Sequence, residues 1–458
     1  MSELLDPLFG DPEISAIFAP RGQLQALLDV EVALAEALAG AGAIPEGAVG
    51  PIRAAARAEF YDLAEIAAGA ARAGNVVIPL VRALTARVEG TDPVAAPFVH
   101  WGATSQDVLD TALVLQLRAA VPVIVASLRR AADAAADHAR RHAGTPMAGR
   151  TWLQQATPIT FGLKASGWCE TLDRAAVRLE ASLARASVLQ LGGAAGTLAA
   201  LGAHALPVAG AMARALDLTL PPAPWHAHRD RFTDLAAALG IATGGLGKIG
   251  RDLGLLAQTE VAEAFEAAPG GSSTMPQKRN PVGAAVALAA AIRAPGLVAT
   301  MLAAMSQEHE RAVGGWQAEW ETLPELVRLT AGAARAVAQA LETLVVDPSR
   351  MRTNLGLTRG LIAAEAAAMA LGATLGRARA HDLVQAGSVR AVAEGRPLAE
   401  ILAEAPEVRE RWSRADLDQL LDPERYLGSA EALVARVLAA RETAGPGTGG
   451  HGGRRTGG

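Results

Sequence analysis

The stretch of this chain best equipped for chemistry is residues 270–281, which read Gly-Gly-Ser-Ser-Thr-Met-Pro-Gln-Lys-Arg-Asn-Pro. Its two opening glycines permit backbone conformations that other residues avoid, so the segment can approach a ligand closely. Ser272, Lys278 and Asn280 add a hydroxyl, an ammonium and an amide group. Asn280 and Pro281 also suit the start of a helix, as its N-cap and first residue. That structural explanation leaves the serine and the lysine unaccounted for, and we therefore expect a ligand-binding or catalytic loop.

A second candidate is residues 104–107, Thr-Ser-Gln-Asp, which precede the apolar run 108–117. They fit a capping box, with Thr104 capping a helix and Asp107 reaching back to it. The free N–H groups at such a helix start also bind carboxylates, because these groups and the helix dipole favour an anion. The sequence supports both interpretations. His100, just upstream, is either a core histidine satisfied by hydrogen bonds or a residue that lines a site.

The loop at 270–281 is similar to the signature loop of the fumarase/aspartase superfamily, Gly-Ser-Ser-x-Met-Pro-x-Lys-x-Asn-Pro. Every fixed position of that pattern is met, by Gly271, Ser272, Ser273, Met275, Pro276, Lys278, Asn280 and Pro281. Two further regions of the superfamily recur in the right order, at residues 100–107 and 149–154. Together the three regions span most of the chain.

This resemblance assigns roles to residues of the first and third regions. Thr104 and Ser105 would hold a substrate carboxylate. Ser272 would exchange the proton on the carbon α to a carboxylate. Because a serine hydroxyl is far too weak an acid to do this unaided, Lys278 and nearby backbone amides would stabilise both the seryl oxyanion and the aci-carboxylate intermediate.

The resemblance also assigns further contacts to the substrate. Arg150 and Thr151 of the second region, and Asn280 of the signature loop, would bind or orient it. His100 matches a histidine that lines the site in the adenylosuccinate lyase branch. Arg311, in a retained Glu-Arg pair, would grip a carboxylate with its forked guanidinium, or else form a bundle ion pair with a neighbouring glutamate.

Position 152 departs from the superfamily in an informative way. Many members have Gly-Arg-Thr-His in this region, and their histidine serves as or orients the general acid, whereas this chain has Trp152. Indole cannot carry a proton at neutral pH, but a carboxylate leaving group needs none, since the pKa of its acid is about 4. Trp152 therefore favours a lactonising reaction and would contact the substrate. His142 is the candidate replacement proton carrier, or else a helix C-terminal histidine that meets the dipole.

Segments 8–11, 24–31 and 314–321 resemble the bacterial cycloisomerases that lactonise 3-carboxy-cis,cis-muconate to 4-carboxymuconolactone in protocatechuate degradation. That branch implies a small tricarboxylate substrate and no cofactor or metal. The alternatives are adenylosuccinate lyase or a related amine lyase, and a catalytically silent scaffold. Trp152 and the lack of a serine-rich phosphate clamp after Arg311 disfavour the lyase, and the intact signature loop disfavours the scaffold.

The composition limits the class of protein. The 458 residues can hold about three domains, and a net charge of -5 without a basic run leaves no electrostatic footprint for nucleic acid. One cysteine, Cys169, excludes an intrachain disulfide and suits a reducing compartment. The chain starts without a secretion signal, and its uncharged segment 186–213 is rich in Ala and Gly. We therefore expect a buried segment there, no membrane span, and a cytoplasmic protein.

Helix-forming residues dominate and alternating strand patterns are nearly absent, so we predict an all-α fold. The clearest helix carries a heptad seam at Leu235, Leu239, Ala242, Leu246, Ile249, Leu253 and Leu256. It also carries glycines, each of which costs about 1 kcal/mol of helix stability, and close helix-to-helix approach would compensate for that cost.

We expect an elongated bundle of long helices at 112–345, two smaller helical domains at 1–111 and 346–440, and a disordered Gly-rich tail at 441–458. By resemblance, the protein is a homotetramer whose sites combine the three regions from different subunits.

Overall fold

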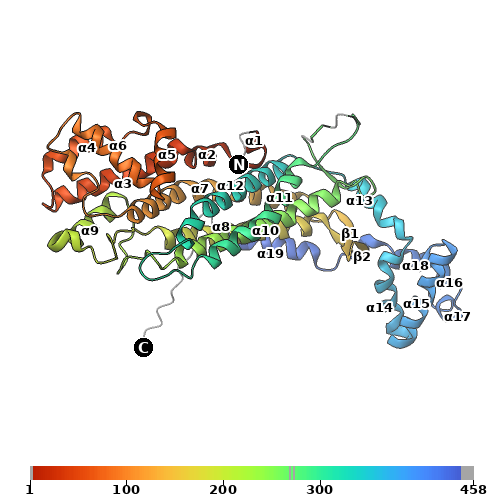
Figure 1. The fold of residues 1–458 in the computed structure, drawn as a ribbon. Helices are drawn as coiled ribbons and strands as arrows, with labels where there is room; N and C mark the ends of the chain where they lie inside the picture. The colour runs from red at the N-terminus through yellow and green to blue at the C-terminus, as the bar shows by residue number, and fades with distance from the viewer. Residues whose placement is uncertain (1–3, 268–269, 272–273, 445–458) are drawn as a thin grey trace, which may run out of the picture. The chain divides into compact units, whose positions relative to one another are not determined.

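The computed structural model describes residues 4–267, 270–271 and 274–444, and helices predominate among them (Figure 1). The chain divides into two compact units. Unit 1 comprises Met1–Leu128, Arg174–Lys248 and Val286–Ala336, and unit 2 comprises Arg129–Asp173, Ile249–Ala285 and Val337–Gly458. Among the described residues, five long helices begin in one unit and end in the other: α7 (Ser105–Arg141), α8 (Phe161–Ala186), α10 (Asp230–Leu256), α11 (Val282–Ala303) and α12 (Gly315–Glu342). The predicted fold of long helices is confirmed in its main part.

Unit 1 contains the N-terminal helices, which pack around α3. Its other helices are α1 (Asp6–Phe9), α2 (Pro12–Ile17), α3 (Pro20–Gly40), α4 (Val49–Ala55), α5 (Leu63–Ala73), α6 (Val77–Glu89) and α9 (Ala205–Ala215), with 3-10 turns η1 (Glu46–Ala48), η2 (Ala58–Phe60), η3 (Ala96–Phe98) and η4 (Ala199–His204). Leu28, Leu34 and Leu38 of α3 are fully buried, because α3 packs against α4 and α9. Because one side of α3 is packed in this way, the helix holds the side chains of its other side in fixed positions.

The seven seam residues predicted on α10 are all buried, which confirms the heptad pattern. A Cβ atom on Gly240 would lie 2.6 Å from Cγ2 of Val298, and one on Gly247 would lie 2.3 Å from Cβ of Ala291. Both neighbours belong to α11, so these glycines allow the two helices to pack more closely than any larger residue would. The close approach expected from the glycines is confirmed at these two positions.

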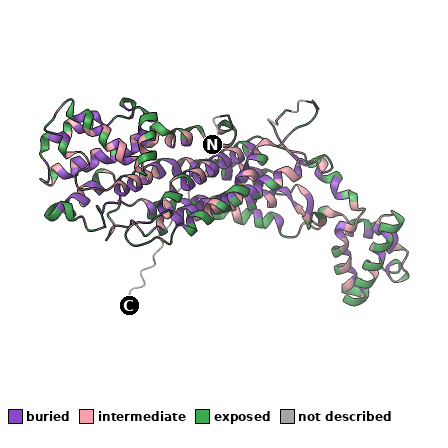
Figure 2. Cartoon of the chain, viewed as in Figure 1, coloured by how far each residue is buried: buried purple, intermediate pink, exposed green. Residues whose placement is uncertain are grey.

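Unit 2 contains the C-terminal helices and two small sheets. Its elements are β1 (Pro146–Thr151), β2 (Gln154–Thr160), β3 (Ala264–Glu266), β4 (Leu344–Val346), α13 (Pro348–Leu355), α14 (Ala364–Leu375), α15 (Arg377–Glu394), α16 (Leu398–Ala403), α17 (Pro406–Arg409), α18 (Arg414–Leu420) and α19 (Ala430–Ala444), with 3-10 turns η5 (Gly356–Thr358), η6 (Leu361–Ala363) and η7 (Pro423–Arg425). Helices α14 to α18 turn buried residues toward one another and exposed residues outward (Figure 2), around a core that includes Leu371, Leu398 and Leu417.

The sheets are the part of the fold that the all-α prediction left out. Strands β1 and β2 form an antiparallel hairpin in which Thr151 pairs with Gln154 across a two-residue turn, and β3 pairs with β4. The register of the hairpin shifts at Gly149, where a Cβ atom would lie only 2.4 Å from the carbonyl oxygen of Thr157. Burial in β1 does not alternate, so its sequence lacks the two-residue period that predicts a strand.

The apolar segments differ from the sequence-based expectation. Residues 186–213, which were expected to be buried, comprise the end of α8, a loop, η4 and part of α9. Residues 188–193 are buried, but residues 202–204 and 206–207 are exposed, so the expectation is correct only in part. By length and hydropathy alone, α7 and α11 could cross a membrane, as could the bent pair Pro348–Thr358 and Leu361–Leu375 if it formed one span. The most apolar window of α7 is 61% buried inside the protein, whereas that of α11 is only 28% buried. Helix α11 therefore presents an apolar surface that the described residues do not cover.

The C-terminal boundary also differs. Helix α19 continues to Ala444, so residues 441–444 are helical and do not belong to the predicted tail. Residues 445–458 lie outside the described residues. The predicted division into domains at 1–111, 112–345 and 346–440 cuts the chain differently from the two compact units, and it stays a prediction.

Candidate active site

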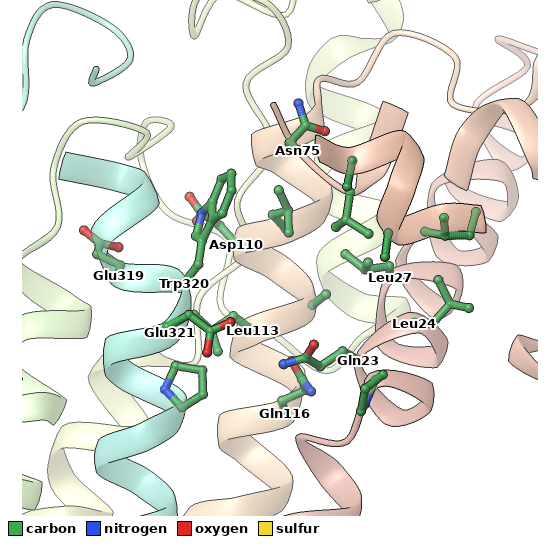
Figure 3. A pocket seen from close by; sticks show the side chains of 18 of the residues that line it. Gln23, Leu24, Leu27, Asn75, Asp110, Leu113, Gln116, Glu319, Trp320 and Glu321 are labelled. Carbon is green, nitrogen blue, oxygen red and sulfur yellow. The ribbon is translucent and has the colours of Figure 1, made fainter. Parts of the chain in front are cut away.

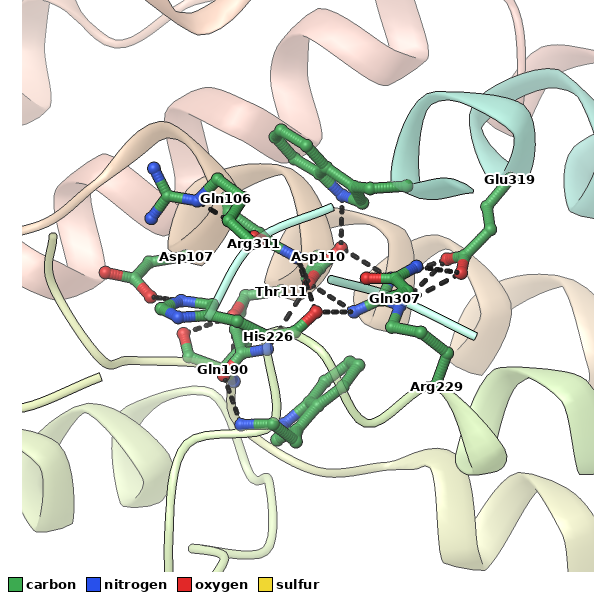
Figure 4. A network of polar contacts seen from close by, with 12 residues as sticks. Gln106, Asp107, Asp110, Thr111, Gln190, His226, Arg229, Gln307, Arg311 and Glu319 are labelled. Carbon is green, nitrogen blue, oxygen red and sulfur yellow. Dashed lines mark hydrogen bonds and ion pairs between the residues drawn. The ribbon is translucent and has the colours of Figure 1, made fainter. Parts of the chain in front are cut away.

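The buried carboxylate of Asp107 holds the start of α7 in place (Figure 4). It accepts a hydrogen bond from the backbone N–H of Thr104 (3.0 Å), which is the reach-back bond of the predicted capping box. It also accepts from the backbone N–H groups of Gly192 (2.8 Å) and Gly193 (2.9 Å), and from Nε2 of His226 (2.7 Å). One side chain thus joins the helix start to two other segments of unit 1. The start itself is half-buried, which leaves it accessible to an anion.

Arg311 contacts the same helix start, beside Ser105 (Figure 4). Its Nε donates to Oε1 of Gln106 (3.1 Å), and its Nη2 donates to the backbone carbonyl of Ala194 (3.1 Å). Both partners of Arg311 are neutral. The alternative interpretation, in which Arg311 serves only the helix bundle, required an ion pair with a neighbouring glutamate. Within the described residues the guanidinium charge is therefore held in position without being neutralised, as a carboxylate-binding group requires.

His100 makes an ion pair with a buried glutamate. Its Nδ1 lies 2.7 Å from Oε1 of Glu31, which is only 2% exposed and whose other oxygen has no partner among the described residues. The backbone of His100 is left-handed, with a φ of 58°. Burial by itself lowers the pKa of His100, but the charge and hydrogen bond of Glu31 and the charge of Asp107 together raise that pKa above its ordinary value. Glu31 and Asp107 therefore favour the protonated form of His100. Reasoning from the sequence did not single out Glu31.

Replacing Glu31 with glutamine should lower the pKa of His100, because burial would then act without a compensating charge. The pair stabilises the fold fully below about pH 6.5, the ordinary pKa of histidine, and this contribution is lost as the pH rises through the raised folded-state pKa. We expect NMR titration of 13C-labelled histidines to show the drop for His100 in E31Q. The matched control is E36Q, which removes another carboxylate of α3 that pairs with Arg53. Equal His100 titration curves in E31Q and wild type would contradict the assignment.

A fully buried ion-pair network lies beneath the helix start (Figure 4). Arg229 donates to Oδ2 of Asp110 on α7 (2.7 Å) and to Oε2 of Glu319 on α12 (2.6 Å). Asp110 also accepts from Nε1 of Trp316 (3.1 Å). The two carboxylates raise the pKa of Arg229, while burial raises the pKa of Glu319 against the opposing effect of Arg229. The network ties the segment that carries Arg229 to α7 and α12, and so fixes the elements that hold Arg311.

In unit 2, Arg150 is committed to a structural ion pair. Its two terminal nitrogens donate to both oxygens of the buried Glu263, at 2.9 and 2.7 Å. Glu263 also accepts from Nδ2 of Asn354 (2.8 Å). These bonds anchor β1 to the segment before β3 and to α13. The described contacts of Arg150 thus explain it as a structural residue, and its predicted contact with a substrate stays a prediction.

The hairpin tip is built unusually. Trp152 and Leu153 form its two-residue turn, and both have a left-handed backbone, with φ of 54° and 65°. Such turns normally use Asn, Asp or Gly, because other residues are strained there by about 1–3 kcal/mol each. The indole is 95% exposed, so no described part of this chain covers it. Thr151 precedes it at the end of β1. The predicted contact of Trp152 with a substrate stays a prediction.

The signature loop is closed at its base by two backbone hydrogen bonds. Gly270 N donates to the carbonyl of Asn280 (2.9 Å), and Asn280 N donates to the carbonyl of Gly270 (3.1 Å). Lys278 is exposed near the end of the loop. Ser272, which carries the predicted proton exchange, and its neighbour Ser273 lie outside the described residues.

The expectation that Asn280 caps the following helix is wrong. Helix α11 begins at Val282, and its first N–H groups, from Gly283 and Ala284, donate to the carboxylate of Glu266 at 3.0 Å each. A carboxylate from β3 thus does the capping, which suits the positive end of the helix dipole. The side-chain amide of Asn280 donates instead to the carbonyl of Gly271 (3.1 Å), inside the loop.

His142 lies just beyond the end of α7 in a small aromatic cluster. It stacks on His138, with ring centroids 6.1 Å apart, and meets the edge of Phe161 at 5.4 Å. Strand β1 separates it from the hairpin tip by roughly 17 Å, at about 3.3 Å per residue. Burial, then the neighbouring His138 and Arg141, lower the pKa of His142 below its ordinary value. Within one chain, His142 is therefore distant from Trp152, and its role as a proton carrier stays a prediction.

The lowered pKa values of His142 and His138 predict acid sensitivity. Below about pH 6.5 these residues take up protons in the unfolded chain but stay neutral in the folded one, so the free energy of unfolding falls as the pH falls. We expect H142F, which keeps a ring on Phe161, to lose less melting temperature than wild type between pH 7.5 and 5.5. The control H204F removes an exposed histidine and should follow wild type. An H142F variant as acid-sensitive as wild type would contradict this expectation.

The predicted site residues thus fall into separate groups in one chain. His100, Thr104, Ser105 and Arg311 gather at the start of α7 in unit 1. Unit 2 holds the hairpin residues Arg150, Thr151 and Trp152, the loop residues Lys278 and Asn280, and His142. Reasoning from the sequence missed Glu31, and it also missed the network around Arg229, whose members are far apart along the chain.

Comparison with known proteins places the chain in a family. A lyase family model matches residues 10–296, and a model of the adenylosuccinate lyase C-terminus matches residues 360–437. The chain is 54% identical to the 3-carboxy-cis,cis-muconate cycloisomerase of Pseudomonas aeruginosa, covering 96% of each protein. It is 43% identical to the nitrosuccinate lyase of Streptomyces davaonensis, covering 97% of this chain and 96% of that protein.

A solved structure agrees with these sequence relationships. The crystal structure of the 3-carboxy-cis,cis-muconate lactonizing enzyme from Pseudomonas putida superposes with a TM-score of 0.92 at 50% identity, covering 96% of this chain and 99% of that one. The match therefore includes both compact units and all three regions singled out in the sequence. The chain belongs to the fumarase/aspartase superfamily of lyases, on the branch of the 3-carboxy-cis,cis-muconate cycloisomerases.

Proposed function

We propose that this enzyme lactonises 3-carboxy-cis,cis-muconate, a small tricarboxylate, to 4-carboxymuconolactone, as a step of protocatechuate degradation. A lone pair of one carboxylate forms a C–O bond to the carbon β to another carboxylate. The electron pair of the double bond moves onto the α carbon and its carboxylate, giving an aci-carboxylate, and a proton then completes the α carbon. The reaction is intramolecular, and apart from the proton taken up at the α carbon it needs no second substrate.

Trp152 is the observation that favours this reaction over the other reactions of the superfamily. In the reverse direction the leaving group is a carboxylate, whose acid has a pKa of about 4, so it departs without being protonated. An amine leaving group would need a general acid where the indole stands. The segment after Arg311 supports the same choice, because Trp316 donates to Asp110 inside the buried network. That segment serves packing and is not built as a phosphate clamp for a nucleotide substrate.

The start of α7 provides the part of the site that recognises carboxylates. Arg311 brings an unneutralised positive charge, and His100 an imidazole whose protonated form Glu31 favours, to a helix N-terminus that opens with Thr104 and Ser105. Together they suit two carboxylate groups of a tricarboxylate. Asn280 and Thr151 would orient the carboxylate next to the reacting carbon.

By resemblance to the superfamily, Ser272 is the residue that supplies the proton to the α carbon. Its oxyanion would form close to Lys278, whose ammonium would also stabilise the negative charge that develops on the aci-carboxylate. The exposed position of Lys278 leaves it free to meet a substrate held elsewhere. Neither a metal nor a cofactor is needed for this scheme, and their absence stays a prediction.

We further propose that each site is completed by other copies of the chain in a cytoplasmic homotetramer. The groups that must act together lie in different units, and Trp152 is 95% exposed. Two large aliphatic side chains of α11, Ile292 (75%) and Leu302 (54%), are also exposed. A long, apolar and uncovered helix is the kind of surface that symmetric oligomers bury against equivalent helices, which explains α11 without a membrane.

The shared site has a direct test. Inactive S272A and T104V tetramers should regain part of their activity when their subunits are exchanged, because some mixed sites would combine an intact Ser272 with an intact Thr104. Mass spectrometry of differently labelled chains would verify the exchange. Verified exchange without any return of activity would contradict the sharing, while leaving the reaction itself untouched.

The reaction is tested by adding the full-length enzyme to three candidate substrates. We expect the conjugated ultraviolet band of 3-carboxy-cis,cis-muconate to disappear, with 4-carboxymuconolactone seen by NMR. Adenylosuccinate should remain unchanged. Nitrosuccinate is included because of the 43% identical lyase, and because nitrite, like a carboxylate, leaves without a general acid. Turnover of either of these two compounds without turnover of the muconate would overturn the proposal.

A further inference from the structure

Gln106 is the second residue of α7 and is fully buried (Figure 4). Its Nε2 donates to Oδ2 of Asp110 (3.2 Å) and to the backbone carbonyl of His226 (2.9 Å). Its Oε1 accepts from Nε of Arg311 (3.1 Å). The side chain therefore joins Arg311, which is half-buried, to the buried ion-pair network beneath the helix start.

These partners fix the direction in which the amide of Gln106 points. A guanidinium group only donates, so it must face the amide oxygen. A carboxylate and a backbone carbonyl only accept, so they must face the NH₂ group. Turned end for end, the amide would place donor against donor at Arg311 and acceptor against acceptor at Asp110. The network thus holds the oxygen of Gln106 toward Arg311.

Gln106 orients Arg311 without a charge of its own. Nη2 of Arg311 donates to the backbone carbonyls of Ala194 (3.1 Å) and Gly193 (3.5 Å), so all the acceptors that hold the guanidinium are neutral. Nη1 makes no hydrogen bond with the described residues and is available to a carboxylate. A carboxylate at position 106 would hold Arg311 equally well, but it would cancel the charge that an anionic ligand needs.

We propose that Gln106 is a positioning residue for substrate binding. Its amide oxygen orients the guanidinium of Arg311 toward a substrate carboxylate, and its neutrality keeps that guanidinium able to bind one. The inference rests on the proposed function, in which Arg311 grips a carboxylate of the tricarboxylate. Gln106 itself is buried and acts only through Arg311. In the structural alternative, Gln106 merely ties α7 to the segment that carries His226.

Gln116 provides a matched control on the same helix. It is also buried, and its Nε2 donates to the backbone carbonyl of Ile17 (2.7 Å). Its side chain lines a pocket between α3, α5, α7 and α12 (Figure 3), and the hydrogen bonds that Arg311 makes with the described residues do not include it. Substitutions of Gln116 should therefore affect stability without changing the grip of Arg311 on a carboxylate.

Q106E tests the charge. By isothermal titration calorimetry of the full-length enzyme, we expect the Kd of tricarballylate, an unreactive saturated tricarboxylate, to rise about tenfold or more. KM for the muconate should rise to a similar extent while kcat falls less than about threefold, because Arg311 holds the same carboxylate before and during the reaction. Q116E should keep all three values within about twofold of wild type.

Three outcomes of this experiment would overturn the inference. The first is a folded Q106E, checked by circular dichroism, that binds tricarballylate as tightly as wild type. The second is a Q106E whose loss lies in kcat while KM is unchanged. The third is a wild-type enzyme that does not bind tricarballylate at all.

Q106M tests the orientation, and it decides the question if Q106E does not fold, because its thioether fills a similar volume without a new buried charge. Tricarballylate should bind Q106M about fivefold more weakly than wild type, whereas R311M/Q106M should bind it as tightly as R311M. An equal loss from Q106M in the wild-type and R311M backgrounds would show that Gln106 acts independently of Arg311, and the positioning role would be wrong.

Tricarballylate binding separates this inference from the proposed reaction. If wild type leaves the muconate unchanged but Q106E loses affinity for tricarballylate, the reaction is wrong and the role of Gln106 stands. If wild type lactonises the muconate and Q106E matches it in both Kd and KM, the reaction stands and the role of Gln106 is wrong.

Discussion

S272A is expected to lower kcat for 3-carboxy-cis,cis-muconate by about 10²- to 10⁴-fold, the range by which a positioned proton-transfer group accelerates a reaction. The carboxylate that attacks is already ionised, so the only proton that must be moved is the one at the α carbon. The measurement is the initial rate of loss of the ultraviolet band.

The control for this prediction is S273A, which removes the adjacent hydroxyl and should cost less than tenfold. Incorporation of deuterium from D₂O at the α carbon of the lactone should slow in parallel with kcat in S272A. An S272A enzyme that retained more than a tenth of wild-type kcat would contradict the assignment of the proton to this serine.

R229M is expected to lower the free energy of unfolding by about 3–5 kcal/mol at pH 7.5, because it leaves two buried carboxylates without their cation. Asp110 and Glu319 would then face each other across an apolar side chain, walled by Trp225 and Phe232, whose ring centroids each lie 5.0 Å from the guanidinium carbon. Urea denaturation of the enzyme at fixed protein concentration measures the loss.

The pH dependence of R229M adds a second readout. Without the cation, protonation of a buried carboxylate becomes favourable, so the variant should regain part of its stability relative to wild type as the pH falls toward 5. The matched control is R293M, which breaks the partly exposed pair with Glu325 and should cost less than about 1 kcal/mol. An R229M loss no larger than that of R293M would contradict the importance of the network.

Local patterns in the sequence were sufficient to predict the helices that carry the site. The seam residues of α10 recur every three to four positions because they all lie on the same, buried face of the helix. This period is visible in the sequence. The bond from Asp107 back to Thr104 was predictable for a similar reason, since the two residues are one helical turn apart.

Contacts between distant segments were not predictable in this way. Asp110, Arg229 and Glu319 each look like surface residues of a helix when read alone, and only the fold brings them together. The same holds for Glu31 and His100, which are 69 positions apart. A charged residue inside a run of otherwise apolar helix positions is the sequence feature that could have pointed to these buried ion pairs.

Two errors had local causes. The hairpin was missed because β1 lacks alternation, and its turn uses Trp152 and Leu153 in place of the usual Asn-Gly. The structural alternative for Asn280, as a helix cap, rested on the favourable Asn-Pro pair, but Glu266 arrives from β3 with a full negative charge and caps the helix. In both places a tertiary contact or a functional requirement outweighed local preference.

The central claim is that a carboxylate leaving group makes a general acid at position 152 unnecessary. The most direct measurement compares kcat for the muconate in wild type, W152H and W152F. Our account predicts that W152H is no faster than wild type, because the carboxylate needs no proton from an imidazole there, and that W152F keeps most of the activity. A kcat of W152H tenfold or more above that of wild type would contradict the account.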